Sequence, residues 1–432
     1  MELKQRLLHQ RLILRIGHAK PYGVGGQHAH TQFTCMHELI HHAGQHIFAL
    51  DIIGCKGMQK IVKRRLHIVK DRGQISPEIH RYQRVWRQQH ARAVRGGIAD
   101  GTVREQGDLI GFFDAGQLPL YGYTAVAVYK DELYAAAIYT DENHKWAPEN
   151  YNTHDLKKLV RRVKKDLPDN PLVEHLANCS LEWHCCTAEN LFYRRWECGI
   201  PTSPVCNANC FGCISLQPAE CCPSPQSRIK FRPTPEEIAE IGIYHLETAP
   251  EGIISFGQGC EGEPSLAADN ISAGISLIRA KTGRGQININ TNAGYTEGIR
   301  KIVDAGLDTM RVSIISAIPE SYAAYYRSSY QLEDVKASIR YALEHGIYVS
   351  LNMLYFPGFN DRAEELAAWK EFFRELPVQM IQVRNLNIDP DAFLAIMPEQ
   401  QSECVGTKAF LQELHQAYPE LVIGSFSHYV EK

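Results

Sequence analysis

Three cysteines fall within eight residues of the sequence, at Cys206, Cys210 and Cys213. Their spacing, C-x3-C-x2-C, allows one short loop to bring three thiolates together. Three thiolates can hold three irons of a [4Fe–4S] cube and leave the fourth iron without a protein ligand. A structural zinc site instead takes four ligands, often as paired C-x2-C units. The spacing therefore favours an iron–sulfur cluster with one open iron over a structural metal site.

Other cysteines lie on both sides of this loop, with aromatic residues between them. Their spacings match no standard ligand template, and small cysteines buried in an aromatic core are the simpler interpretation. A second iron–sulfur or zinc site is the alternative hypothesis. Its candidate ligands are Cys179, Cys185, Cys186, Cys198, Cys221 and Cys222.

A second motif with chemical meaning is the H-E-x-x-H of His37, Glu38 and His41. On a helix this spacing places two imidazoles on one face, with the glutamate as general base for a zinc-bound water. The first hundred residues contain 11 of the 19 histidines, so such a match arises easily by chance. A zinc-dependent hydrolase is therefore an alternative that the sequence favours less.

The composition is that of a globular protein with more than one part. The chain has 432 residues, of which 44% are hydrophobic and 22% charged, and this length exceeds that of an ordinary single domain. No apolar run approaches the length of a membrane helix, and the N-terminus lacks the apolar core of a signal peptide. The 13 cysteines then indicate metal or redox chemistry in a reducing cytoplasm rather than a disulfide framework.

Charge is distributed unevenly along the chain. Residues 1–100 carry 17 Lys and Arg against 6 Asp and Glu, although the whole chain has a net charge of only −3. Apolar residues in this part follow neither a helical nor a strand period. We expect residues 1–105 to be a basic, histidine-rich extension that is disordered or that stems from a mis-assigned start. A basic arm of this kind also leaves a nucleic-acid-binding protein with a structural metal site as a further alternative.

Residues 106–199 are expected to form a small α+β accessory region with the cysteine and aromatic cluster. Strands are predicted over 122–129 and 133–139, and a helical stretch over 154–177 that Pro168 and Pro171 break. Lysines and arginines cover one face of that helix, which indicates a solvated surface or, as an alternative, an RNA contact.

From residue 200 onward the sequence alternates between strands and amphipathic helices. The expected strands cover 200–205, 252–256, 286–291, 309–315, 347–355 and 379–387, with helices over 234–248, 266–282, 296–305, 331–345 and 362–376. Apolar strands alternating with helices predict a parallel sheet covered by helices. Right-handed crossovers curl such a sheet into a partial or full (β/α) barrel of about six strands, here over 200–390. Residues 391–432 form a C-terminal extension with a helix over 407–417 and a strand over 421–424.

Polar residues follow the ends of these strands. They include the cysteine loop, Glu263, Asn292, Ser313 and Asn360. In parallel (β/α) folds the functional groups gather at the carboxyl ends of the strands. The sequence therefore predicts one site, at that end of the barrel.

In these features the chain from about 200 to 390 resembles the radical S-adenosylmethionine superfamily. The resemblance rests first on the cysteine motif after the first strand. It rests further on Gly262-Glu263-Pro264 after the second strand, Thr291-Asn292 after the third, Ser313 on the fourth and the Phe356–Asp361 segment after the fifth.

The resemblance implies a [4Fe–4S] cluster on Cys206, Cys210 and Cys213 and S-adenosylmethionine chelated by the open iron. Reductive cleavage of the cofactor would give a 5′-deoxyadenosyl radical that takes a hydrogen atom from the substrate. The cofactor-binding residues it implies are Gly262, Glu263, Asn292, Ser313 and Asn360. It also implies oxygen sensitivity and an electron donor such as flavodoxin or ferredoxin.

One position departs from the family pattern. An aromatic residue usually precedes the third cysteine, and here that position is Gly212, with Phe211 before it. The substrate could be a small molecule, a peptide or an RNA, and a second metal site on the neighbouring cysteines stays open.

Overall fold

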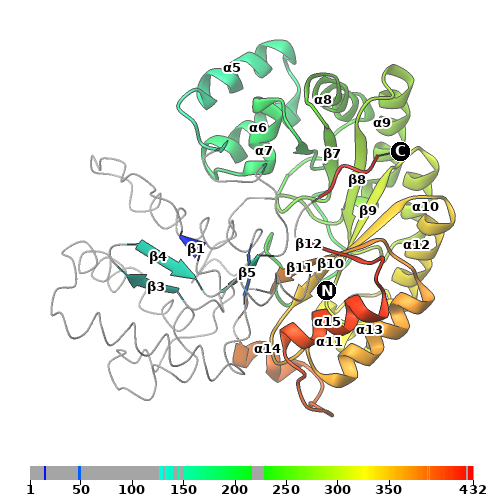
Figure 1. Ribbon diagram of the computed structural model, residues 1–432. Helices are drawn as coiled ribbons and strands as arrows, with labels where there is room; N and C mark the ends of the chain where they lie inside the picture. The colour runs from blue at the N-terminus through cyan, green and yellow to red at the C-terminus, as the bar shows by residue number, and fades with distance from the viewer. Residues whose placement is uncertain are drawn as a thin grey trace.

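The structure is a computed structural model. It describes residues 150–216, 228–386, 388, 390–424 and 427–431, together with 14–15, 47–49, 126–129, 132–135, 137–139 and 145 (Figure 1). Only 14–15 and 47–49 of the predicted extension 1–105 are among the described residues. The predictions for His37, Glu38 and His41, and those for Cys221 and Cys222, lie outside the described residues.

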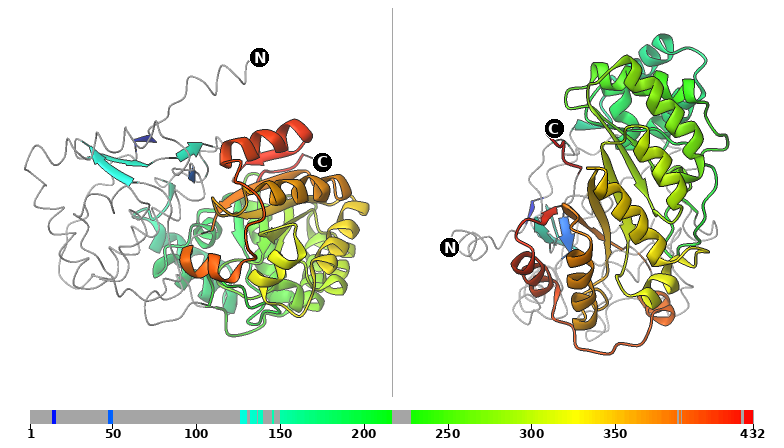
Figure 2. Two further views of the ribbon diagram at one scale, coloured as in Figure 1. Left: turned by 90° about the horizontal axis from the view of Figure 1, so that it is seen from below. Right: turned by 90° about the vertical axis from the view of Figure 1, so that its right-hand side faces the viewer.

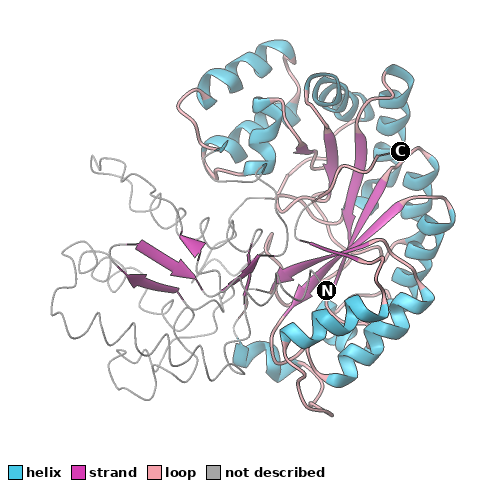
Figure 3. Ribbon diagram, in the orientation of Figure 1, coloured by secondary structure: helices cyan, strands magenta, loops and turns pink. Residues whose placement is uncertain are grey.

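A seven-stranded parallel sheet forms the centre of the fold, in the order β12-β11-β10-β9-β8-β7-β6. The strands fan out along this sheet, as the twist of a parallel sheet requires (Figure 3). The two outermost strands, β6 and β12, do not pair with each other, so the sheet is an open, partial barrel. Its strands are β6 (Glu197–Gly199), β7 (Ile253–Phe256), β8 (Gln286–Thr291), β9 (Thr309–Ile314), β10 (Tyr348–Tyr355), β11 (Met380–Asn385) and β12 (Val422–Gly424).

The predicted α/β class is confirmed, with one correction at the first strand. The expected strand over 200–205 is wrong, because β6 ends at Gly199 and extended chain follows it. Pro201 and Pro204 lack the N–H that a sheet ladder needs. The added edge strand β12 brings the sheet to seven strands rather than about six.

Helices cover the outer side of the sheet. Figure 2 shows the green-to-orange helices in a layer beside the strands. They are α8 (Pro235–Thr248), α9 (Ala268–Lys281), α10 (Thr296–Asp304), α11 (Pro319–Tyr326), α12 (Leu332–Glu344), α13 (Ala363–Glu375), α14 (Pro390–Ile396) and α15 (Thr407–Ala417), with a short 3-10 turn at Pro264–Ala267. The start of α8 has the capping box expected from the sequence, between Thr234 and Glu237.

Residues along the strands alternate between this apolar outer layer and a polar inner face. Ile287 and Ile289 of β8 are fully buried in the core. Asn288 and Asn290, which alternate with them along the strand, face inward. The same alternation places Arg311 and Ser313 of β9 inward. The inner face of the partial barrel is therefore a polar surface suited to polar ligands.

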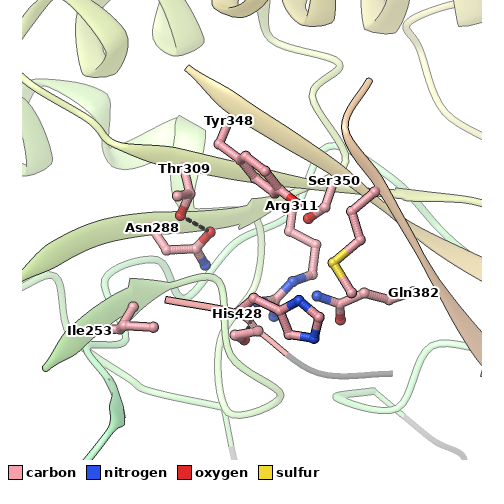
Figure 4. A pocket seen from close by; sticks show the side chains of 10 residues that line it. Ile253, Asn288, Thr309, Arg311, Tyr348, Ser350, Gln382 and His428 are labelled. Carbon is pink, nitrogen blue, oxygen red and sulfur yellow. Dashed lines mark hydrogen bonds between the residues drawn. The ribbon is translucent and has the colours of Figure 1, made fainter. Parts of the chain in front are cut away.

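The amino-terminal half of this polar face is closed by the C-terminal segment 427–431. Ser427 contacts both Arg311 and Glu197, and Arg311 Nη1 lies 3.6 Å from Glu197 Oε1 in a buried ion pair. Val430 N donates to Gln286 Oε1 at 3.0 Å. The cavity left between these groups measures about 20 Å³ (Figure 4), room for about one water molecule. The amino-terminal half of the polar face is therefore covered by this segment.

Three helices, α5 (Leu156–Asp166), α6 (Pro171–Leu181) and α7 (Cys186–Tyr193), precede the sheet. The helical stretch predicted over 154–177, broken by Pro168 and Pro171, is present as two helices. The first ends at Asp166, and the second starts after Asn170, whose side chain caps α6 with Pro171 at the first helical position. Helices α7, α11 and α14 were not predicted from the sequence.

The predicted strand pair in the accessory region is also present, as β3 (Val126–Tyr129), β4 (Glu132–Ala135) and β5 (Ala137–Tyr139). Strands β3 and β4 pair antiparallel, β4 pairs with β1 (Leu14–Arg15), and β5 pairs with β2 (Ile47–Ala49). In the described part of the chain, no helix is long and apolar enough to cross a membrane.

Candidate functional site

The cysteine loop begins at Cys206, after the extended segment that follows β6. Two backbone hydrogen bonds fasten this segment to the loop after β7: Gly262 N donates to the carbonyl of Ser203 at 2.6 Å, and Glu263 N donates to that of Val205 at 2.8 Å. A Cβ atom on Gly262 would lie 2.0 Å from the Val205 carbonyl oxygen. Only glycine therefore allows the two loops to approach this closely.

The other side of the cysteine loop is held by the end of α11. Asn209 N donates to the carbonyl of Tyr326, and Phe211 N donates to that of Tyr325, both at 3.0 Å. Arg327 Nε donates to the Asn209 carbonyl at 2.8 Å. The loop is thus fixed by its backbone on two sides, and its thiols do not take part in these bonds.

The three thiols are half-buried and interact electrostatically with one another. Burial raises the pKa of the Cys206 and Cys210 thiols, and the neighbouring Cys213 raises both further. Arg228 Nη2 lies 3.7 Å from Cys213 Sγ, and its charge opposes the upward shift at Cys206. Sequence reasoning missed this arginine, because nothing in its spacing connects it to the loop.

The arrangement of these thiols fits a cluster better than a single ion. Among the described residues, only His175, Cys179 and Cys260 bring three metal-binding atoms within 4.8 Å of one another. The sulfurs of Cys206, Cys210 and Cys213 are therefore spread more widely than the ligands of one ion. A [4Fe–4S] cluster needs such spreading, because each cysteine binds a different iron.

Glu263 connects the loop after β7 to the end of β8. Its carboxylate is buried and accepts hydrogen bonds from Asn292 N at 2.8 Å and from Ser265 N at 3.0 Å, and Thr291 Oγ1 donates to it as well. Burial raises the pKa of this carboxyl, and the hydrogen bonds oppose that shift. The glutamate thus holds the third strand end beside the cysteine loop.

Asn292 and Asn207 link the same strand end directly to the cysteine loop. The Nδ2 atom of Asn292 donates to the Oδ1 atom of Asn207 at 2.7 Å. The Oδ1 atom of Asn292 accepts a hydrogen bond from Gly294 N at 2.9 Å and so shapes the turn that follows. The structure therefore brings the predicted residues Glu263 and Asn292 together with the cysteine motif.

Ser313 and Asn360 lie further along the same end of the sheet. Ser313 faces the polar interior and accepts a hydrogen bond from Asn352 Nδ2 at 3.5 Å. Asn360 is fully buried, where its Oδ1 accepts from Phe356 N at 2.7 Å and its Nδ2 donates to the carbonyl of Ile315. Asn360 thus joins the ends of β9 and β10, and Ser313 is the more accessible of the two.

Glu261 is a site-forming residue that sequence reasoning missed. One of its carboxylate oxygens accepts from Thr202 N at 2.7 Å and Ser203 N at 3.0 Å, and the other accepts from Gly257 N at 2.6 Å and Gln258 N at 3.0 Å. Burial raises the pKa of this carboxyl to about 7, against the effect of these bonds. The glutamate ties the segment before the cysteine loop to the loop after β7.

A half-buried polar layer lines the carboxyl-end half of the inner face. It consists of Asn290, Ser313, Asn352 and Arg384. Arg384 Nε donates to Asn352 Oδ1 at 3.2 Å, and its Nη2 donates to Gln382 Oε1 at 3.0 Å. The corresponding residues of the other half, such as Asn288 and Gln382, are buried. This layer is the accessible part of the polar interior.

Gly212, the departure from the family pattern, packs against Tyr325 of α11. A Cβ atom there would lie 2.9 Å from the tyrosine Oη and 3.3 Å from side-chain atoms of Leu386 and Ile388. The Tyr325 ring therefore takes up space beside the third cysteine that a larger residue at 212 would need.

Substituting Gly212→Ala is expected to lower the melting temperature by a few degrees, because the contact with the Tyr325 hydroxyl costs about 1 kcal/mol. The double variant G212A/Y325F removes that oxygen and should recover most of the loss. Differential scanning fluorimetry of wild type, both single variants and the double variant measures the coupling. Equal melting temperatures for G212A and the double variant would contradict this explanation.

The predicted second-site cysteines separate into different environments. Cys198 is buried in the core of the sheet, and Cys186 packs with Tyr151. Burial and the nearby Glu197 and Cys185 raise the pKa of the Cys198 thiol, and neither Cys186 nor Cys198 belongs to a close group of three metal-binding atoms among the described residues. Cys179 instead meets two residues absent from the prediction, His175 and Cys260.

Comparison with known proteins gives a family match. Residues 200–369 match the Radical SAM superfamily. The GTP 3′,8-cyclase of Aquifex aeolicus (strain VF5) is 28% identical over 195 residues, which are 44% of this chain and 56% of the relative. This chain therefore covers little more than half of that relative.

Two solved structures are similar to part of the chain. HydG, a maturase of the [FeFe]-hydrogenase, is 18% identical, with a TM-score of 0.37 and coverage of 64% of each chain. Methylornithine synthase is 16% identical, with a TM-score of 0.37 and coverage of 61% of this chain and 78% of that chain.

Proposed function

We propose, from the premise that residues 200–369 form a radical SAM domain, that this chain is a radical enzyme. It binds a [4Fe–4S] cluster and reductively cleaves S-adenosylmethionine. The observation that carries the proposal is the fixed cysteine loop, whose three thiols take no part in the hydrogen bonds that hold it beside Gly262, Glu263 and Asn292.

Each residue of the site then has a part in binding. Cys206, Cys210 and Cys213 hold the cluster, which supplies an electron to the sulfonium of the bound cofactor. The backbone at Gly262 and the carboxylate of Glu263 favour a cationic amino group nearby, and Asn292 and Ser313 offer hydrogen bonds to polar groups of the cofactor. Asn360 positions the strand ends from within the core.

The accessible polar layer is the proposed place for the substrate. Arg384 and Asn352 belong to it. Because segment 427–431 covers the amino-terminal half of the polar face, the carboxyl end is the proposed route of entry. A guanidinium in this layer favours a substrate with an anionic or strongly polar group. Flavodoxin or ferredoxin is the proposed electron donor, in a reducing cytoplasm, which suits nine free cysteines among the described residues.

The test is reductive cleavage by the protein purified without oxygen. We expect about four irons per chain, and release of 5′-deoxyadenosine when dithionite and S-adenosylmethionine are added, measured by mass spectrometry. Addition of S-adenosylmethionine alone should change the EPR spectrum of the reduced cluster, because the cofactor binds the open iron. A protein that carries four irons but neither responds to S-adenosylmethionine nor releases 5′-deoxyadenosine would disprove the proposal.

A further inference from the structure

A compact group of three metal-binding side chains lies apart from the cysteine loop. His175 and Cys179 are four residues apart on α6, so they lie on the same face of the helix. Their Nε2 and Sγ atoms are 3.6 Å apart. Cys260, from the loop after β7, completes a group in which all three atoms lie within 4.8 Å of one another.

The spacing and the donor types suit one thiophilic ion. In a tetrahedral zinc site, with Zn–S of about 2.3 Å and Zn–N of about 2.1 Å, the ligand atoms lie about 3.5–3.8 Å apart. The observed spacing needs only a small contraction to reach this range. The cysteines of an iron–sulfur cluster bind different irons and lie further apart, so this group differs in kind from Cys206, Cys210 and Cys213.

The surroundings of the group also favour a bound ion. Cys179 and Cys260 are 1% and 3% exposed, so water does not compete for their sulfurs. Cys185 lies beside them: its backbone N donates to the Cys179 carbonyl at 3.0 Å, and its thiol interacts electrostatically with both other thiols. Cys185 is also the N-cap residue of α7, so the start of that helix fixes its position.

We propose that His175, Cys179 and Cys260 bind a single zinc-type ion, with Cys185 as the fourth donor. The ion joins helix α6 to the loop after β7. That loop contains Glu261, which fixes the segment before the cysteine loop, and it leads to Glu263. The ion would thus be a structural ion that connects the helices α5–α7 to the loops of the site. Its binding does not depend on the proposed function.

The test is metal analysis of full-length protein purified without oxygen and dialysed against a weak chelator. Zinc and iron are measured together by mass spectrometry for wild type, C179S, C260S and the control C404S, which changes an exposed cysteine. We expect C179S and C260S to contain about one zinc per chain less than C404S, with iron unchanged. The triple variant C206A/C210A/C213A should lose its iron and keep this zinc, which separates the two sites.

A second measurement uses unmodified protein, so it does not depend on the folding of a variant. X-ray absorption at the zinc edge should show sulfur together with imidazole nitrogen around the ion. Zinc contents of C179S and C260S equal to that of C404S would overturn the proposal. So would a zinc shell of oxygen and nitrogen alone, or a Cys179–Cys260 disulfide in native protein alkylated without a reductant.

Discussion

Replacement of Cys210 with alanine is expected to remove the iron–sulfur cluster and abolish cleavage of S-adenosylmethionine. Cys210 is held in the middle of the loop by bonds from Asn209 and Phe211 to the end of α11. Two remaining thiolates do not retain a cube that already lacks one protein ligand. Iron should fall from about four per chain to near zero, and 5′-deoxyadenosine should fall below detection.

The matched control is Cys404→Ser, which changes an exposed cysteine remote from the loop. It should keep wild-type iron content and wild-type cleavage. A C210A protein that kept both its iron and its cleavage activity would show that the cluster is bound elsewhere, and the assignment of all three ligands would fail with it.

Substitution of Gly262 with alanine is the second change with a large expected effect. The added Cβ would lie 2.0 Å from the carbonyl oxygen of Val205, which is backbone and cannot rotate away. The loop after β7 must then separate from the cysteine loop and lose the hydrogen bonds at Ser203 and Val205. We expect a loss of about 1–3 kcal/mol in the free energy of unfolding and about a 100-fold decrease in cleavage rate from misplaced groups.

Gly283→Ala is the control for this substitution, because a Cβ atom at that position meets nothing within 4 Å. Its melting temperature and cleavage rate should equal those of wild type or exceed them slightly. Both variants are compared by thermal unfolding, iron content and 5′-deoxyadenosine release. If G262A cleaved S-adenosylmethionine at the wild-type rate, the contact between the two loops would have no role in the site.

Local sequence patterns were sufficient to predict the barrel core. The helix over 234–248 with its capping box at Thr234, and the strand over 286–291, depend on neighbouring residues and were predicted from them. The edge strand β6 was misplaced by several residues because its three residues are too few to show a period. Helix α11 was missed because it has only eight residues, and because Ala323 and Ala324 lie between its buried tyrosines, so that no run of polar residues marks a second face.

The candidate site was predictable only where a motif is continuous in the sequence. The cysteine loop met that condition. The group of His175, Cys179 and Cys260 did not, because its third member comes from a different element and only the packing of α6 against the loop after β7 joins them. Arg228 and Glu261 were missed for the same reason, since each acts on the cysteine loop through a contact that no spacing rule contains.

The covering of the amino-terminal half of the polar face by segment 427–431 has a consequence for folding during translation. The ion pair of Glu197 and Arg311 is covered by Ser427, which leaves the ribosome after every strand of the sheet. Until residues 427–431 have been synthesised, the polar interior is open to water at both ends. The nascent sheet can therefore form its apolar outer layer first, and the ion pair of Glu197 and Arg311 is covered only when translation reaches the last of these residues.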